Sequence, residues 1–138
     1  MDMMQPFDQN MRLLGKVLDL RAKKAEVIAA NIANAETPGY SASRFDFEED
    51  LASAIGAGQG LALSTSHSNH IALRPAAVEQ VSGNIVTTVD RSGIGDRNSV
   101  SVNQEMLDLS ENQLLYETAA QLLKKKMGQL SYAITGGQ

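Results

Sequence analysis

The sequence predicts a mainly α-helical protein, with long N- and C-terminal helices forming a coiled-coil-like pair around a short irregular or β-hairpin middle segment. Near both ends of the chain, apolar residues recur in alternating steps of four and three, as in helices that pack along a seam. Residues 56–100 are instead crowded with Gly, Ser, Asn and Thr, which favour turns. From 138 residues we expect a single domain, 1–138, with a helix over 6–35, a loop-rich middle over 36–100 and a helix over 101–135.

The first predicted helix begins near Pro6 and ends near Ala35. Proline suits the first turn because its missing N–H would have no intrahelical partner there, and Pro38 disfavours helix at the residue before it. The expected seam consists of Phe7, Met11, Leu14, Leu18, Ala25, Ile28, Ile32 and Ala35, with Arg21 as its break.

The last predicted helix repeats this arrangement. Ser101 and Gln104 match a capping box, Glu105 places negative charge near the positive helix end, and Gly136-Gly137 supplies a stop. The expected seam consists of Val102, Met106, Leu109, Tyr116, Ala120, Leu123, Met127, Leu130 and Ile134, with Gln113 as its break.

Both predicted helices carry a second, partial apolar stripe. An antiparallel pair cannot bury two such wide faces, so we expect some apolar surface to remain for neighbouring chains. An ordinary two- or three-helix bundle explains the periodicity about as well. The second stripes are Leu13, Val17, Leu20 and Val27 on the first helix and Leu115, Ala119 and Leu122 on the last.

The middle segment offers only short elements. Asp46 to Ile55 can form a short acidic helix, and residues 61–63 and 85–89 resemble short strands. The glycine-rich residues 56–60 read as a connector, because no Lys-Ser or Lys-Thr follows to hold a nucleotide.

No residues in the sequence form a recognisable catalytic, cofactor or metal site. There is no cysteine, and His67 and His70 are two ligands where zinc needs three or four from the protein. The carboxylates of residues 48–50 lack the alternating ligands of a calcium loop, and no G-x-S-x-G elbow appears. We expect no enzyme activity, no cofactor and no small-molecule substrate.

Charge and hydropathy bear on partners and location. The formal net charge is −4, and Lys124 to Lys126 stand without interleaved aromatic residues, so we expect no nucleic acid partner. Polar residues interrupt the start of the chain, and no apolar run approaches the roughly 20 residues that cross a bilayer. We expect neither a cleavable leader nor a membrane span.

The stretch AANIANAETPGY, Ala29 to Tyr40, resembles the N-terminal signature of the flagellar rod, hook and hook-associated protein family. That signature is a heptad helix ending in Asn-x-x-Asn, followed by Thr-Pro-Gly-Tyr. Further stretches are similar to the proximal rod members: RFDFEEDL at 44–51, SHSNHI at 66–71 and NSVSVNQEM before the last helix. Ser101 and Ser41 depart from the acidic residue and the lysine that usually stand there.

The resemblance implies a structural subunit of the proximal rod of the bacterial flagellar basal body, in the periplasm. It implies export by the flagellar type III system and assembly through the terminal helices into the drive-shaft tube that transmits torque. The implied partners are other copies of the chain, FliE, the FliF ring, FlgC, FlgF and the type III export gate. Phe47 and Leu51 match the export-gate motif of this family, a Phe followed four residues later by an apolar residue. The alternatives are an FlgC-type rod protein, a cytoplasmic helical adaptor or a small hydrolase.

The seams and the resemblance together predict the subunit interface. Asn31 and Asn34 can bond orphaned carbonyls or a neighbouring chain, Pro38-Gly39 turns the backbone, and Tyr40 offers an amphipathic anchor. The expected interface consists of Leu14, Leu18, Ile28, Asn31, Ile32, Asn34, Thr37, Pro38, Gly39, Tyr40, Leu109, Tyr116, Leu123 and Leu130.

Overall fold

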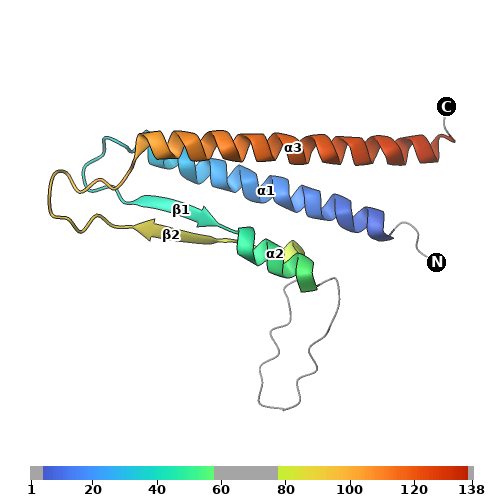
Figure 1. Ribbon diagram of the computed structural model, residues 1–138, viewed down its shortest axis with the longest axis horizontal. Helices are drawn as coiled ribbons and strands as arrows, with labels where there is room; N and C mark the ends of the chain where they lie inside the picture. The colour runs from blue at the N-terminus through green and yellow to red at the C-terminus, as the bar shows by residue number, and fades with distance from the viewer. Residues whose placement is uncertain (1–4, 58–77, 137–138) are drawn as a thin grey trace, which may run out of the picture.

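The computed structural model describes residues 5–57 and 78–136 and is mainly helical (Figure 1). Two long helices lie along the molecule, and a two-stranded sheet with a short helix lies beside them. The predicted mainly α-helical class is confirmed. In chain order the elements are α1 (Gln5–Ala33), β1 (Ala42–Asp46), α2 (Glu48–Ala57), the 3-10 helix η1 (Val78–Gln80), β2 (Asn84–Thr88) and α3 (Val102–Ile134).

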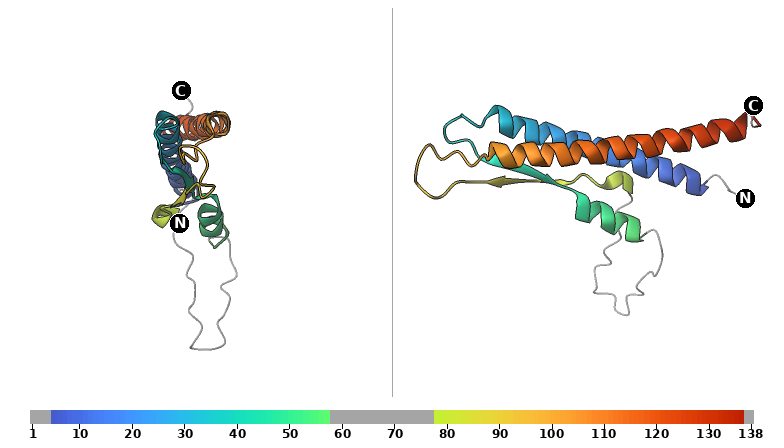
Figure 2. Two further views of the ribbon diagram at one scale, coloured as in Figure 1. Left: turned by 90° about the vertical axis from the view of Figure 1, so that its left-hand side faces the viewer. Right: turned by 45° about the horizontal axis from the view of Figure 1, so that its top comes forward.

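The two long helices run antiparallel and are the main packing partners of one another (Figure 2). The side chain of Asn31, near the end of α1, donates to Glu105 near the start of α3, and Arg21 meets Asn112 further along. The predicted pairing of the terminal helices is therefore confirmed. The predicted bounds lie within two residues of those observed, because proline, glycine and the heptad pattern act locally.

The N-terminus of α3 differs from the predicted capping box. Ser101 is the N-cap residue, but its side chain makes no capping hydrogen bond. Gln104 instead donates to Asp108 one turn further on, which leaves no reciprocal bond to Ser101. At the other end, Gly136 has a φ of +69°, the left-handed conformation in which glycine ends helices.

The middle segment packs along α1 on a face next to the one that meets α3, so that α1, β1 and α3 border one groove. Strands β1 and β2 are antiparallel, with Phe45 paired to Ile85, and β1 lies against α1. The buried cluster beneath them consists of Leu20, Phe45, Phe47, Leu51, Ala54 and Val81, with Leu13, Val17, Val27 and Val78 packed against it. The second stripe of α1 is thus covered by the chain's own middle segment, so this stripe is not part of the apolar surface expected to remain for neighbours.

The sheet is built from one predicted strand and one that the pattern missed. Residues 85–89 were expected to be extended, and β2 occupies Asn84–Thr88. Its partner is β1, whose sequence ASRFD shows no run of β-branched residues. The expected helix over 46–55 is confirmed as α2. The expected strand at 61–63, like His67 and His70, lies outside the described residues.

Candidate assembly site

The turn after α1 is held by the loop that precedes α3. The Asn98 side-chain amide donates to the backbone oxygens of Asn34 and Thr37, at 2.9 and 2.8 Å. The backbone N–H of Gly39 donates to Asp96 O, and Gly39 has a φ of +73°, which favours glycine. The Thr-Pro-Gly-Tyr turn is therefore a joint between the two terminal helices, held in place from both sides.

Asn31 is the polar centre of this joint and is only 1% exposed. Its amide nitrogen donates to Ser43 O at 2.6 Å, and its amide oxygen accepts from Ser43 N at 2.9 Å. The same nitrogen donates to Glu105, and the oxygen accepts a 3.3 Å bond from the Tyr40 hydroxyl. Asn31 thus pairs with Ser43 as a neighbouring strand would, which holds the start of β1 on α1.

Asn34 forms its side-chain hydrogen bonds at the end of α1. Its side-chain nitrogen donates to Ala30 O at 2.8 Å, a carbonyl of the last helical turn. Its side-chain oxygen accepts a bond from the Thr37 hydroxyl. Ala30 O also accepts the backbone N–H of Asn34, so the carbonyl that the Asn34 side chain bonds is not an orphaned one, and Asn31 bonds strand and side-chain partners within its own chain.

Sequence reasoning missed Asn98 and Ser99, although both lie in the NSVSVNQEM stretch. The Ser99 hydroxyl accepts from Ala42 N and donates to Thr88 O, each at 2.7 Å, so it bridges the ends of the two strands. Polar residues just before a helix are common N-terminal signals. Nothing in the local sequence shows that Asn98 and Ser99 instead bond residues more than 50 positions away.

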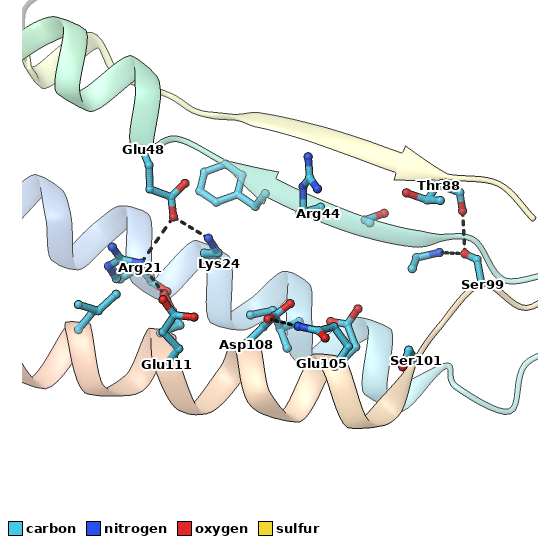
Figure 3. A pocket seen from close by; sticks show the side chains of 17 residues that line it. Arg21, Lys24, Arg44, Glu48, Thr88, Ser99, Ser101, Glu105, Asp108 and Glu111 are labelled. Atoms are coloured by element: carbon cyan, nitrogen blue, oxygen red, sulfur yellow. Dashed lines mark hydrogen bonds and ion pairs between the residues drawn. The ribbon is translucent and has the colours of Figure 1, made fainter.

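A charged groove of about 540 Å³ opens between α1, β1 and α3 (Figure 3). On its α1 side, Lys24 Nζ lies 2.6 Å from Glu48 and Arg21 lies 3.7 Å from the same carboxylate. Burial opposes charge on Glu48, but hydrogen bonds from Lys24 and from the backbone outweigh it and lower the pKa of Glu48. Glu105, Asp108 and Glu111 line the α3 side.

Arg21 makes polar contacts at the position where the apolar seam of α1 was predicted to be interrupted. Its guanidinium donates to Asn112 Oδ1 at 3.3 Å, and the buried Asn112 side chain donates back to Arg21 O at 2.9 Å. The Arg21 guanidinium also lies 5.1 Å from the ring centre of Phe47, close enough for a cation–π contact. One arginine therefore links α3, α1 and the core under the sheet.

The chain resembles a family of flagellar rod proteins along its whole length. The family model described as flagella basal body rod protein matches residues 18–40, the second half of α1 and the turn after it. The FlgB flagellar basal body rod protein of Aeromonas hydrophila is 34% identical, over 96% of this chain and 97% of its own. Its counterpart in Salmonella typhimurium is 31% identical, over 98% and 99% of the two chains. The chain belongs to the FlgB family. The FlgB protein of Escherichia coli K12 is 30% identical, over 98% of this chain and 99% of its own.

Family membership confirms the identification from the signature and places the chain in the flagellar basal body as a structural rod protein. This family is not an enzyme class. No helix of the described residues is long and apolar enough to span a membrane. Within residues 5–57 and 78–136, no three His, Asp or Glu side chains gather where they could hold a metal ion.

The predicted interface residues fall into three groups by their exposure in this structure. Ile28 and Asn31 are buried inside the chain, whereas Thr37 to Gly39 and Tyr116 are exposed. Leu14, Leu18, Ile32, Asn34, Tyr40, Leu109, Leu123 and Leu130 are half-buried. Their contacts with other subunits stay a prediction, and for Ile28 and Asn31 the internal packing is a role in its own right.

Phe47 and Leu51 lie in the core instead of on the surface. Phe47 is 2% exposed, and both side chains belong to the buried cluster beneath the sheet. Phe47 directly precedes α2 and Leu51 lies in its first turn, where the Leu51 N–H donates to Phe47 O at 2.9 Å. A receptor can reach this pair only when the core is open.

Apolar side chains remain exposed along much of α3. Only Asn112 and Ala119 of this helix are buried, although it has 33 residues. The exposed large apolar residues on it are Val102, Met106, Leu107, Leu114, Leu115, Tyr116, Leu122, Met127, Tyr132 and Ile134. Because α3 packs mainly against α1, most of its circumference is exposed to solvent. Apolar side chains stand on this exposed part as well as on the side that α1 covers.

Proposed function

We propose that this FlgB-family protein is a subunit of the proximal rod, exported by the flagellar type III system and built into the drive-shaft tube that crosses the periplasm and transmits torque. Its terminal helices make the contacts between subunits. Other copies of the chain, FliE, the FliF ring, FlgC and FlgF are the neighbours expected in such a tube.

The exposed apolar surface of α3 carries this proposal. Apolar area removed from water contributes about 25 cal/mol per Å². Ten large apolar side chains on one helix are far more than scattered surface residues, and they extend over its whole length. Assembly against several neighbours would bury them, whereas the helix pair alone does not.

Ile28 is unsuitable for testing the interface, because a charge at this buried position would break the fold of the subunit itself. Leu122 and Met127 are exposed and lie on α3. We expect Leu122→Asp with Met127→Asp to leave the unfolding of the purified chain unchanged and to abolish motility and recovery of the chain in isolated basal bodies. Ile94→Asp, at an exposed apolar position in the loop before α3, is the matched control.

Two results would overturn the proposal. One is a motile strain carrying the double variant with ordinary amounts of the chain in its basal bodies. The other is absence of the wild-type chain from purified basal bodies, together with hooks that still form when its gene is lost.

Export through a narrow channel requires an unfolded chain, and unfolding exposes Phe47 and Leu51. We expect Phe47→Ala with Leu51→Ala to reduce secretion. Both substitutions also remove core volume, so the control must destabilise the same core without changing the FEEDL stretch. Val81→Ala does this, because Val81 is buried in the same cluster. Equal loss of secretion in the control and the double variant would count against the motif.

A further inference from the structure

The side of α3 turned away from α1 carries a heptad stripe of its own. Its positions follow alternating steps of four and three, so they share one face of the helix. Leu107, Leu114 and Tyr132 are 66%, 64% and 67% exposed, and every member of the stripe is an exposed residue. We call it the outer stripe; it consists of Leu107, Glu111, Leu114, Thr118, Gln121, Lys125, Gly128 and Tyr132.

Gly128 has no explanation in the packing of a single chain. It lies inside α3, where glycine destabilises a helix relative to alanine. A Cβ built at Gly128 meets no atom within 4 Å, so nothing in this chain requires the missing side chain. A close approach by another molecule is one structural reason for glycine inside a helix.

The outer stripe also carries two charges. Glu111, at the border of the groove, and Lys125 form no ion pair with another described residue. Lys125 stands nine residues before the end of α3 at Ile134, and helix-dipole effects fall off within the last turn. Glu111 and Lys125 are 14 residues apart, which is also the separation of Leu114 and Gly128.

We propose that the outer stripe binds the α3 helix of a second copy of this chain, with the two helices parallel and displaced by two heptads. At 1.5 Å per residue the displacement is about 21 Å. Glu111 then faces Lys125 of the next copy, and Leu114 faces Gly128, where a missing side chain leaves room for it. The inference deepens the proposed function and rests on it.

Other arrangements of two copies fit less well. Parallel helices without displacement put Glu111 against Glu111 and Lys125 against Lys125. An antiparallel pair also joins Glu111 to Lys125, but it sets Gly128 beside Asp108 and closes into a two-fold dimer. The displaced parallel contact is heterologous, so each copy offers its free end to the next and the contact can propagate along a rod.

Charge and apolar area have separate roles in this contact. Exposed ion pairs add little affinity, because water screens them, but like charges in contact exclude a wrong register. Burial of Leu107, Leu114 and Tyr132 supplies the attraction. We therefore expect the charges to select the displacement and the leucines to hold it.

Cysteine cross-linking tests the geometry directly, because the chain contains no cysteine of its own. The displacement pairs position 118 of one copy with position 132 of the next. In basal bodies isolated from cells that carry Thr118→Cys with Tyr132→Cys, mild oxidation should give a ladder of multimers, and neither single variant should cross-link.

Each other outcome overturns the inference. A dimer from Thr118→Cys alone indicates the antiparallel pair. No ladder from a double variant that is present in the basal bodies shows that this stripe is not the contact, while the proposed function stands. Absence of the wild-type chain from basal bodies removes both.

A charge exchange tests the register in motile cells. We expect Lys125→Glu to cause loss of motility, because it sets two carboxylates together, and Glu111→Lys with Lys125→Glu to restore it. Lys124→Glu makes the same change of charge at an exposed position off the outer stripe and should leave motility intact. Equal effects at the two lysines, or no restoration by the double exchange, would contradict the assigned register.

Discussion

Replacing Asn31 by alanine should destabilise the protein by about 3 kcal/mol, because Asn31 joins α1 to the sheet and to α3. Each of the two short bonds to Ser43, at 2.6 and 2.9 Å, contributes roughly 1 kcal/mol net. Leaving the paired Ser43 groups without a partner in a half-buried site adds about 1 kcal/mol. The bond to Glu105 is not counted, because this carboxylate lines the open groove, where water can replace the lost donor.

The free energy of unfolding is measured by urea denaturation of the purified chain at low concentration, where assembly does not contribute. At about 4 °C per kcal/mol for a chain of this size, the melting temperature should fall by roughly 10 °C. Asn34→Ala is the matched control within the same signature. Asn34 bonds an exposed helix end, so its loss should cost at most about 1 kcal/mol.

Asn31→Asp separates hydrogen bonding from side-chain size. Aspartate keeps the acceptor for Ser43 N but loses the donor to Ser43 O, and it places a carboxylate beside Glu105. We expect it to destabilise at least as much as alanine at neutral pH and to recover at low pH, when the carboxyl is protonated. An Asn31→Ala variant within about 0.5 kcal/mol of wild type, or equal to Asn34→Ala, would refute the role assigned to this amide.

Two further substitutions test the sheet and the groove. Burial opposes the charge of Glu48, but the hydrogen bond from Lys24 lowers its pKa below 4.5, so the charged form adds stability that is lost as pH falls through the folded pKa. The difference in unfolding free energy between wild type and Glu48→Gln should shrink between about pH 7 and about pH 3; a constant difference would contradict it. Gly83 has a φ of +69°, and a Cβ there would lie 2.5 Å from Phe45 Cζ, so Gly83→Ala should cost more than about 1 kcal/mol in urea denaturation. Gly93→Ala has a similar φ of +68° with open space around it, so an equal loss there would show that backbone strain alone, and not the clash, is responsible.

The helices were predictable because their signals are local. Pro6, Pro38 and Gly136 stand at or near the helix ends, and the heptad pattern needs only the neighbouring turns. Strand β1 was not predictable in this way. It is held by the Asn31 amide and by β2, whose partner residues lie 38 to 46 positions along the chain.

The site shows the same division. The signature over Ala29 to Tyr40 identifies the family, and it places Asn34 and the turn correctly. It does not show that Asn98 forms hydrogen bonds to this turn from 61 residues further along the chain. Nor does it show that Arg21 bonds Asn112, which is 91 residues away. Hydrogen-bonding partners so far apart depend on how the elements pack, which no short pattern encodes.

The sequence alone determined two long helices, the acidic short helix between them and membership of the flagellar rod family, because periodicity and local breakers set the backbone of each segment. Only the tertiary structure decided what covers each apolar stripe. Leu13, Val17, Leu20 and Val27 pack beneath the sheet, while Leu107 and Leu114 stay exposed on α3. A heptad pattern shows that a helix face is apolar; the neighbour that covers it is chosen by contacts between distant parts of the chain.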